Sequence, residues 1–326
     1  MSADRPSEVV LAARVAREYY LEGASKIDIA ERLGISRFRV ARLLDSARES
    51  GMVRIEIGWP GRTLDPGLSA ELCAAYGLAH AFVYNFPEAQ DSPGAADGTT
   101  SLRRRLGEAT GQVLMDLISA GDILGLAWSR TLSGLTASLT QMPPCPIVQL
   151  TGAVPPPDGR DLLELVRSVA RVGGGPAHVF YAPMLVPDAA TADAIRRQPD
   201  IAEAFALTPT VTTAVVSIGA WGPGMSTIYD AVTPAERSQV KSLGVPGELA
   251  GVFIDADGQP VQTPLDSRMI VTPGPLLQGI PLVLAVAFGV EKLGAVSAAL
   301  RGGLVHGLVT HATLARALLD VAPARG

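Results

Sequence analysis

The chain has 326 residues, of which 48% are hydrophobic and 18% charged, and its formal net charge is -5. This length predicts a small domain plus a larger one, and the composition is typical of a folded protein and excludes a disordered chain. The longest apolar run, 281–288, is far shorter than the roughly 20 residues of a membrane-spanning helix, and residues 1–6 do not resemble a signal peptide, so we expect a cytoplasmic protein.

Residues 8–50 carry the pattern of three short helices. Apolar residues at spacings of three and four predict a helix over 8–21. Ser25 is expected to cap a second helix, Gly34 to form a tight turn, and Ser36 to cap a third helix that runs to about residue 50. The buried stripe of the second helix is expected to be Ile27, Ala30 and Leu33. Two helices joined by a short glycine turn are typical of a helix-turn-helix motif.

Positive charge is concentrated around the third predicted helix. Residues 32–54 contain six arginines and two acidic residues, Asp45 and Glu49, a local net charge of +4 in a chain of -5. Such a local excess indicates a DNA-binding surface, although a solvated charged face is the alternative. The expected buried face of this helix is Val40, Leu43, Leu44 and Ala47. The residues that we expect to contact DNA are Ser25, Ser36, Arg37, Phe38, Arg39, Arg42 and Arg54.

A linker is expected at 58–66, where glycine and proline are frequent, between a DNA-binding domain of residues 1–57 and a larger domain of residues 67–326. A short strand is predicted within 52–57. In the larger domain, apolar strand candidates alternate with helical patterns, which predicts an α/β fold with a mostly parallel sheet covered on both faces. The predicted strands are 81–84, 123–127, 147–149, 178–181, 213–218, 251–254, 282–287 and 305–309. The predicted helices are 99–119, 131–140, 160–172, 188–197, 233–243, 290–300 and 311–321.

The turn after the predicted strand 123–127 contains the sequence Ser129-Arg130-Thr131. Parallel sheets bind ligands at the carboxyl ends of their strands. Two hydroxyls, free backbone N–H groups and a guanidinium in one turn suit an anion. A polar helix cap is the other interpretation of this turn.

Four later turns contain further candidate ligand contacts. Gln149 follows a strand and is suited to bond a hydroxyl-rich ligand or the neighbouring backbone. Gly219 either leaves room for a ligand or adopts a positive φ. Glu248 is suited to accept hydrogen bonds from sugar hydroxyls. Lys292 lies in the first turn of a predicted helix, which is unfavourable for the helix dipole, so we expect an anionic partner such as a phosphate or Glu248, or else a solvated lysine.

Motifs in both predicted domains are shared with one known family. In the first domain they are Ile29-Ala30, Leu33-Gly34-Ile35-Ser36-Arg37, Val40, Arg42-Leu43-Leu44, Ala47-Arg48, Gly51 and Val53. In the second they are Gly125 to Thr131, Gln149-Leu150-Thr151-Gly152, Tyr181-Ala182-Pro183-Met184, Ile218-Gly219-Ala220, Gly247-Glu248, Phe253 to Gly258 and Phe288 to Gly303. In their order and number these motifs resemble the SorC/DeoR family of sugar-binding transcriptional regulators.

The resemblance implies a larger domain that is related to sugar-phosphate isomerases and serves as a sensor of phosphorylated sugars. It implies that Ser129, Arg130 and Thr131 hold a phosphate, that Gln149 and Glu248 hold sugar hydroxyls, and that Lys292 meets the anion. The full set of expected effector-binding residues is Gly125, Ser129, Arg130, Thr131, Gln149, Gly152, Gly219, Glu248, Asp255, Gly289 and Lys292.

The chain departs from the family pattern at three of its positions. Ser129 and Phe288 replace small glycines, which predicts a narrower pocket. His311 stands where the family often carries an acidic residue.

We therefore expect a DNA-binding transcriptional regulator whose operator affinity or assembly responds to a sugar or sugar-phosphate effector. A dimer or tetramer is expected because one helix-turn-helix unit reads few base pairs. No cofactor, metal site or catalytic residue is predicted. For a metal site the reason is that Cys73 and Cys145 lack metal-ligand spacing. The alternative is a sugar-phosphate isomerase-like enzyme with a DNA-binding appendage, for which Glu248, Asp255 and Lys292 are the candidate acid–base groups.

Overall fold

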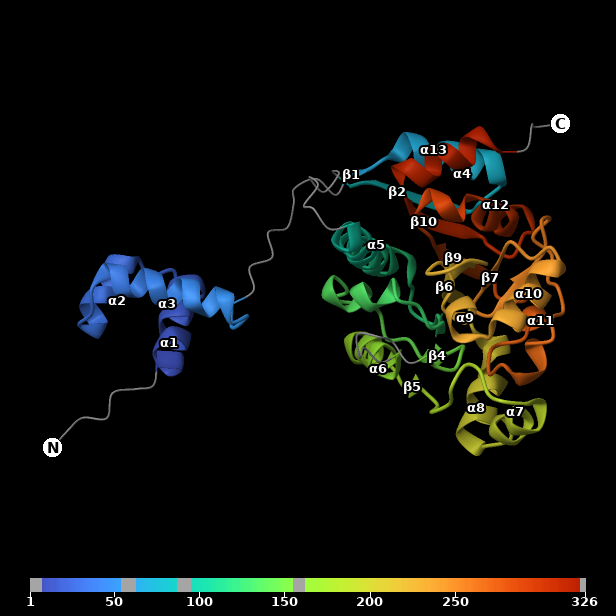
Figure 1. Ribbon diagram of the computed structural model, residues 1–326, viewed down its shortest axis with the longest axis horizontal. Helices are drawn as coiled ribbons and strands as arrows, with labels where there is room; N and C mark the ends of the chain where they lie inside the picture. Colours follow the sequence, from blue (N-terminus) through green and yellow to red (C-terminus); the bar gives the residue numbers. More distant parts are fainter. Residues whose placement is uncertain (1–7, 54–62, 87–94, 155–161, 323–326) are drawn as a thin grey trace. The chain divides into compact units, whose positions relative to one another are not determined.

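The computed structural model describes residues 8–53, 63–86, 95–154 and 162–322 (Figure 1). The chain divides into two compact units, Met1–Pro60 and Gly61–Gly326, and the division falls inside the expected linker. Arg54 and most of the strand expected at 52–57 lie outside the described residues. Each unit is described separately below.

The N-terminal unit consists of three helices, α1 (Glu8–Tyr20), α2 (Lys26–Leu33) and α3 (Arg37–Glu49). Ser25 caps α2 in a capping box with Asp28, in which each side chain accepts a hydrogen bond from the other residue's backbone N–H at 3.2 Å. Gly34 ends α2 in the left-handed region with φ 63°, and Ser36 caps α3 by accepting from the Arg39 N–H. The expected helices and caps are therefore present in this unit.

A small apolar core joins the three helices. Its buried residues are Ala12, Val15, Ala16, Ile29, Ala30, Val40, Leu43, Leu44 and Ala47. The face predicted for α3 is thus the buried one. In α2 the prediction was wrong for Ile27, whose side chain is 58% exposed, because the helix turns Ile29 to the core instead.

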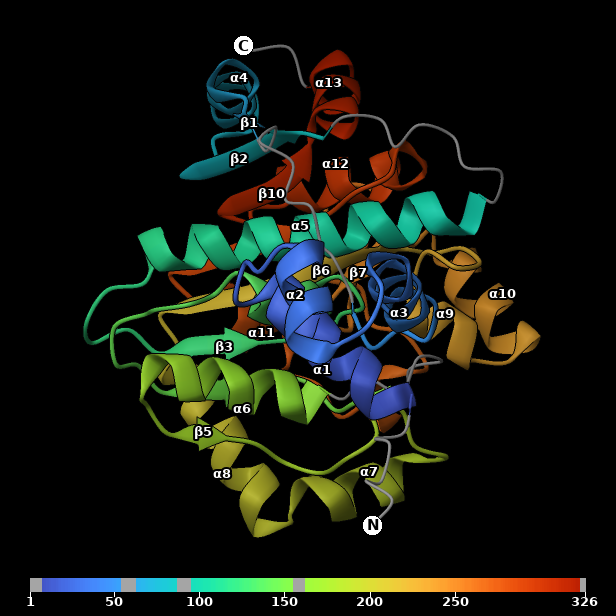
Figure 2. The same ribbon diagram turned by 90° about the vertical axis from the view of Figure 1, so that its left-hand side faces the viewer.

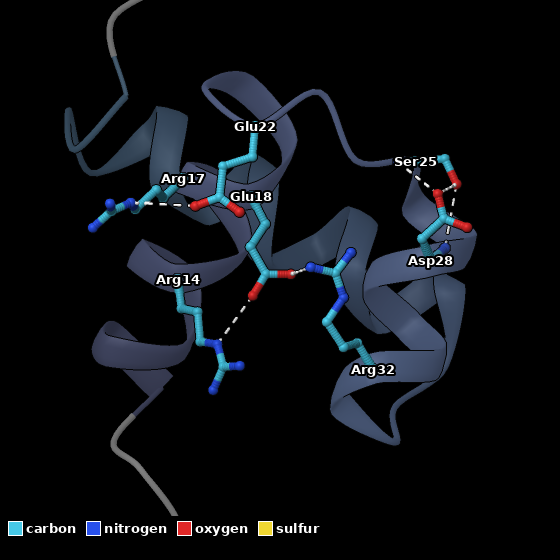
Figure 3. Close-up of polar contacts among 7 residues, drawn as sticks. All are labelled: Arg14, Arg17, Glu18, Glu22, Ser25, Asp28 and Arg32. Carbon is cyan, nitrogen blue, oxygen red and sulfur yellow. Dashed lines mark hydrogen bonds and ion pairs between the residues drawn. The ribbon is translucent and has the colours of Figure 1, made fainter.

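A buried carboxylate also ties α1 to α2 (Figure 3). Glu18 is only 6% exposed, and it accepts a hydrogen bond from Arg14 Nε at 3.1 Å and pairs with Arg32 Nη1 at 3.5 Å. Nearby, the exposed pair Arg17–Glu22 is 3.4 Å apart. Glu18 therefore joins α1 to α2 electrostatically.

The second unit is built on one twisted sheet. Its strands are β1 (Thr63–Leu64), β2 (His80–Asn85), β3 (Leu124–Leu126), β4 (Ile147–Gln149), β5 (Ala177–His178), β6 (Thr213–Ala220), β7 (Gly247–Leu249), β8 (Val252–Ile254), β9 (Leu282–Val286) and β10 (Gly307–His311). The strand order is β1-β2-β10-β9-β6-β3-β4-β5, with β7 beside β6 and β8 beside β7. From β2 to β5 all neighbours are parallel, whereas β1, β7 and β8 pair antiparallel. The predicted α/β fold with a mostly parallel sheet is confirmed.

Helices connect the strands of this unit. The α-helices are α4 (Pro66–Tyr76), α5 (Ala95–Leu117), α6 (Leu162–Gly173), α7 (Ala189–Arg196), α8 (Pro199–Leu207), α9 (Thr227–Ala231), α10 (Pro234–Ser242), α11 (Gly274–Gln278), α12 (Leu293–Arg301) and α13 (Ala312–Asp320). Short 3-10 helices are η1 (Leu132–Ala137), η2 (Thr208–Thr210), η3 (Asp266–Arg268) and η4 (Val290–Lys292). Among the described helices, none has both the length and the apolar character that crossing a membrane requires.

Each face of the sheet has its own apolar core, because successive strand residues point to opposite sides. On β6, Ala214 and Val216 pack with residues of α4, α12 and α13, while Val215 packs on the other face with residues of α5 and α6. Figures 1 and 2 show α5 and α6 together on one side of the sheet. The strands are thus buried on both faces, as their continuous apolar sequences predicted.

The helix expected at 131–140 is instead the short 3-10 helix η1. This segment is rich in serine, threonine and glycine, which are weak helix formers. Glycines also let η1 approach α5 closely, since a Cβ atom on Gly134 would meet the Arg104 carbonyl oxygen at 2.6 Å. Close packing against α5 therefore overrides the helical periodicity here.

The contacts in Figure 3 predict different costs for removing two carboxylates of the N-terminal unit. Glu18→Ala is expected to destabilise this unit by about 1–2 kcal/mol, since it removes a buried charged hydrogen-bond acceptor. Glu22→Ala, which breaks an exposed pair, is expected to cost less than about 0.5 kcal/mol. Amide hydrogen exchange in α1 and α2 of the full chain measures both, and equal protection in the two variants would contradict the role given to Glu18.

Candidate functional site

A pocket lies where the strand order reverses. The chain continues outward from β3 to β4 and β5, then returns to β6 on the other side of β3 and continues to β9 and β10. The loops after β3 and β6 therefore leave the sheet in divergent directions, and the carboxyl ends of open α/β sheets bind ligands at such a point. The pocket is an open hollow of about 660 Å³, a volume that includes solvent-exposed space.

The pocket wall is formed by the loops after β3, β6, β7 and β9, by parts of β6, β7, α5 and α9, and by Met184 from the segment after β5. The polar and charged residues of the wall are Arg103, Ser129, Arg130, Thr131, Ser217, Ser226, Thr227, Glu248, Glu291 and Lys292. Three cationic side chains face two carboxylates, so the wall has a net charge of +1 when all five are ionised.

Glu248 is the buried acidic group of the pocket. It lies on β7 opposite Gly219 of β6 and is only 7% exposed. Its Oε1 accepts a hydrogen bond from Ser226 Oγ at 3.0 Å, and its Oε2 accepts from the Gly251 N–H at 3.0 Å. Burial raises the pKa of this carboxyl, while the two hydrogen bonds and Lys292 oppose the shift. Glu248 is thus a fixed acceptor in the pocket wall.

Gly219 is the residue that makes room for this carboxylate. A Cβ atom at this position would meet Glu248 Oε1 at 2.1 Å and the Cβ atom of Ser226 at 3.0 Å. Its φ does not lie in the left-handed region, so the positive-φ interpretation of this glycine was wrong. Close approach of β6 to the Glu248 side chain is therefore the reason for glycine here.

Lys292 brings a cation to the pocket. It ends η4, and its Nζ donates a hydrogen bond to the Ile218 carbonyl oxygen at 3.1 Å. Burial lowers its pKa to about 8, and the charges of Arg130 and Arg103 add to this, whereas Glu248 opposes it. The sequence placed Lys292 where its charge is unfavourable for the helix dipole, and the structure places it in the pocket wall. There the negative charge of Glu248 favours the protonated form of the lysine.

The loop after β3 forms another side of the pocket. Ser129 and Thr131 are buried there, and Ser129 Oγ accepts from the Thr131 N–H at 3.1 Å. Arg130 is half-buried and donates to the Gly224 carbonyl oxygen at 2.9 Å, which joins this loop to the loop after β6. Because η1 has only six residues, this loop offers an anion its polar side chains rather than a helix dipole.

Of the expected effector-binding residues, six line the pocket: Ser129, Arg130, Thr131, Gly219, Glu248 and Lys292. The other five have different surroundings. Gln149 is fully buried, and its amide bonds the backbone of Thr151 and Phe180, which is the second of its two interpretations. Asp255 accepts from the N–H groups of Asp257 and Gln259 and closes the turn after β8.

The remaining three are glycines that allow close packing. A Cβ atom on Gly125 would lie 2.8 Å from the Leu150 side chain, and one on Gly152 would lie 2.7 Å from the backbone of the segment after β5. Gly289 has φ 89° and donates its N–H to His311 Nε2 at 3.1 Å. These three glycines therefore affect how the segments near the pocket pack, but they do not line the pocket itself.

Sequence reasoning missed five polar residues of the wall, Arg103, Ser217, Ser226, Thr227 and Glu291. Ser226 caps α9, and only the fold shows that its hydroxyl also bonds Glu248. Arg103 belongs to α5, far from the strand-end motifs in sequence. Arg103 lies next to the β9 loop because of the way α5 packs on the sheet, and no local sequence pattern indicates that packing.

The third helix of the N-terminal unit presents its predicted cationic surface. Phe38 is 69% exposed and lies under the Arg37 guanidinium, 5.1 Å from it. Arg39 is 3.7 Å from Glu8, whereas Arg42 makes neither an ion pair nor a hydrogen bond with any described residue. The side chains of Ser25 and Ser36 are exposed but serve as helix caps, so the charge available to a ligand comes from the arginines.

Comparison with known proteins agrees with these two units. Residues 65–320 match the family model described as "Putative sugar-binding domain". The chain is 32% identical over 331 residues to the transcriptional regulator LsrR of Klebsiella pneumoniae subsp. pneumoniae, covering 97% of this chain and 94% of that protein. It is 28% identical over 308 residues to the uncharacterized transcriptional regulator YjhU of Escherichia coli K12, covering 92% of each.

The fold of the whole chain also has a solved counterpart. The crystal structure of the full-length sorbitol operon regulator SorC from Klebsiella pneumoniae matches with a TM-score of 0.70 at 21% identity, covering 97% of this chain and all of that one. The sequence matches thus extend over both units. The chain belongs to the SorC/DeoR family of sugar-binding transcriptional regulators.

Proposed function

We propose that the protein is a regulator that binds operator DNA through α3 and a phosphorylated sugar in the pocket at the ends of β3, β6 and β9. The choice of ligand class rests on one observation: the same pocket contains cationic side chains and a buried carboxylate that accepts hydrogen bonds. Arg130 and Lys292 suit a phosphate, and Glu248 suits the hydroxyls of a sugar. An uncharged sugar would leave the net charge of +1 in the pocket wall uncompensated.

The hydroxyls of Ser129 and Thr131 are placed to complete the phosphate site. Both are buried in the loop that also carries Arg130. A bound phosphate would accept hydrogen bonds from these groups and offset the desolvation of Lys292. Glu248 already bonds Ser226 and Gly251. Each of its oxygens has two lone pairs, so the carboxylate can accept further bonds from a ligand.

On the DNA side, α3 supplies arginines without strong internal partners. Arg37 and Arg42 are exposed, and Phe38 lies between them on the outer face. Arg54 lies outside the described residues and remains a proposed backbone contact. We propose a homo-oligomer, because two recognition helices are needed to read an operator of adequate length. The ligand then acts by favouring one arrangement of the subunits.

The enzymatic alternative has little support in the pocket. Of its three candidate acid–base groups, Glu248 and Lys292 line the pocket, while Asp255 holds its own turn. The curated relatives named above are transcriptional regulators. Turnover of a phosphorylated sugar during the binding experiments below is the result that would favour an enzyme.

The pocket predicts a thermal-shift response to phosphorylated sugars. In a panel of free and phosphorylated pentoses, hexoses and polyols, a phosphorylated member is expected to raise the Tm, because binding to the folded state stabilises it. Arg130→Ala is expected to weaken its affinity by about 10- to 100-fold, the loss of one or two charged hydrogen bonds. The control Arg171→Ala removes an exposed arginine outside the pocket and should leave the response unchanged. A free sugar that outperforms its phosphate would contradict the proposed ligand class.

The lowered pKa of Lys292 predicts a pH dependence of binding. Affinity for the phosphorylated ligand is expected to fall as the pH rises above about 8, because the lysine loses its positive charge there. The ligand's own charge is constant in this range, since the second pKa of a phosphate monoester is about 6. Titration calorimetry at several pH values measures this, and Lys292→Arg, which stays charged, should abolish the fall. An unchanged pH profile in the arginine variant would remove Lys292 from the anion site.

The exposed arginines predict different effects on DNA binding. Arg42→Ala is expected to weaken binding to duplex DNA of random sequence and to reduce the slope of log affinity against log salt by about one. Arg17→Ala removes the same charge from α1, where the arginine is paired with Glu22, and should change the slope little. Fluorescence anisotropy across a salt series compares them. Equal slopes for the two variants would show that α3 is not the contact surface.

A further inference from the structure

Phe288 forms a rigid part of the pocket wall. It follows β9, lines the pocket, and is only 5% exposed because its ring also packs in the apolar core on the α5 side of the sheet. The residues before and after Phe288 each donate a backbone hydrogen bond to β10. The Ala287 N–H donates to the Val309 carbonyl oxygen at 3.1 Å, and the Gly289 N–H donates to His311 Nε2 at 3.1 Å.

These bonds fix the place from which the ring projects. The two hydrogen bonds hold the backbone on either side of Phe288, and packing in the apolar core restricts the rotation of its ring. His311 has a part in this, since it stands at the end of β10 and supplies the acceptor for Gly289. The Phe288 ring is therefore a well-held boundary of the pocket.

The same ring lies against two of the pocket's three cations. The Arg103 guanidinium carbon is 5.6 Å from the ring centroid, and Lys292 Nζ is 5.4 Å from it. Both distances fall within the range of cation–π attraction. Arg103 comes from α5 and Lys292 from η4, so the ring is the common neighbour that keeps cations from two separate elements at one side of the pocket.

From these contacts we propose that Phe288 determines the effector's size, so that the pocket accepts short phosphorylated sugars of pentose length and rejects longer ones. The inference rests on the proposed function, because it concerns the same pocket. The ring fills space next to the cations that a longer sugar chain would need. A ligand whose phosphate lies near Arg130 and Lys292 must place its sugar in the space that Phe288 and Glu248 both line.

Two substitutions separate the volume of the ring from its attraction for the cations. Phe288→Ala removes both, and opens space beside the cations. Phe288→Leu keeps an apolar side chain of considerable volume but has no aromatic face. The leucine variant also serves as the test if the alanine variant does not fold, since it retains most of the packing in the core.

The experiment measures the affinities of ribose 5-phosphate and glucose 6-phosphate for the full chain and both variants by titration calorimetry. We expect the wild type to prefer the pentose phosphate, and Phe288→Ala to shift the affinity ratio toward the hexose phosphate by about tenfold or more. Phe288→Leu should bind both ligands several-fold more weakly and keep most of the preference. This pattern would assign size selection to the volume of the ring.

Two results would overturn the inference, and they have different meanings. Wild-type preference for the hexose phosphate, or an unchanged ratio in both folded variants, would remove Phe288 as the size determinant and leave the proposed function standing. A wild type that binds neither ligand, nor any member of the wider panel of phosphorylated sugars, would overturn the proposed function itself and the inference with it.

Discussion

The reversal of strand order between β3 and β6 is the constraint on which the rest of the structure depends. It places the carboxyl ends of three neighbouring strands, β9, β6 and β3, beside one another while their loops diverge. Residues as distant in sequence as Ser129 and Lys292 come together only for this reason. The antiparallel addition of β7 to β6 then brings a carboxylate to the same place, since Glu248 pairs with Gly219. The sheet thereby fixes both the position and the charge pattern of the pocket.

Keeping these charges in the pocket costs free energy in the unliganded protein. Burial raises the pKa of Glu248 and lowers that of Lys292, so each group is held in surroundings that disfavour its charged form. Partial compensation comes from the chain itself, through Ser226 and Gly251 for the carboxylate and the Ile218 carbonyl for the ammonium group. The proposed ligand, with a phosphate and hydroxyls, would complete this compensation.

The sequence predicted the parts of the fold that depend on local patterns. The caps Ser25 and Ser36, the buried face of α3 and the strands on both sides of the pocket follow from spacing, capping chemistry and apolar runs, which act over a few residues. The division of the chain near the linker had the same local origin, in glycine and proline.

The errors came from tertiary packing, which the local sequence does not record. The segment 131–140 has helical periodicity, but contact with α5 makes it a 3-10 helix. Gln149 looked like a ligand contact, and its amide instead joins two backbone segments. For the same reason Arg103 was missed, because its position depends on where a long helix lies on the sheet. Motifs thus located the strand ends correctly, while the side chains that arrive from helices had to be found in the structure.

The separate core of the N-terminal unit limits how a ligand can regulate DNA binding. The three helices pack on one another, and Glu18 joins α1 to α2 without any residue of the larger unit. Ligand binding therefore has no need to refold α3 in order to act. In the proposed homo-oligomer, a change in how the subunits are spaced would alter operator affinity while leaving each recognition helix intact, because two helices must match the spacing of two half-sites. The charges of the chain fit this division: α3 carries exposed arginines, and the larger unit holds buried charges in the pocket proposed for the effector.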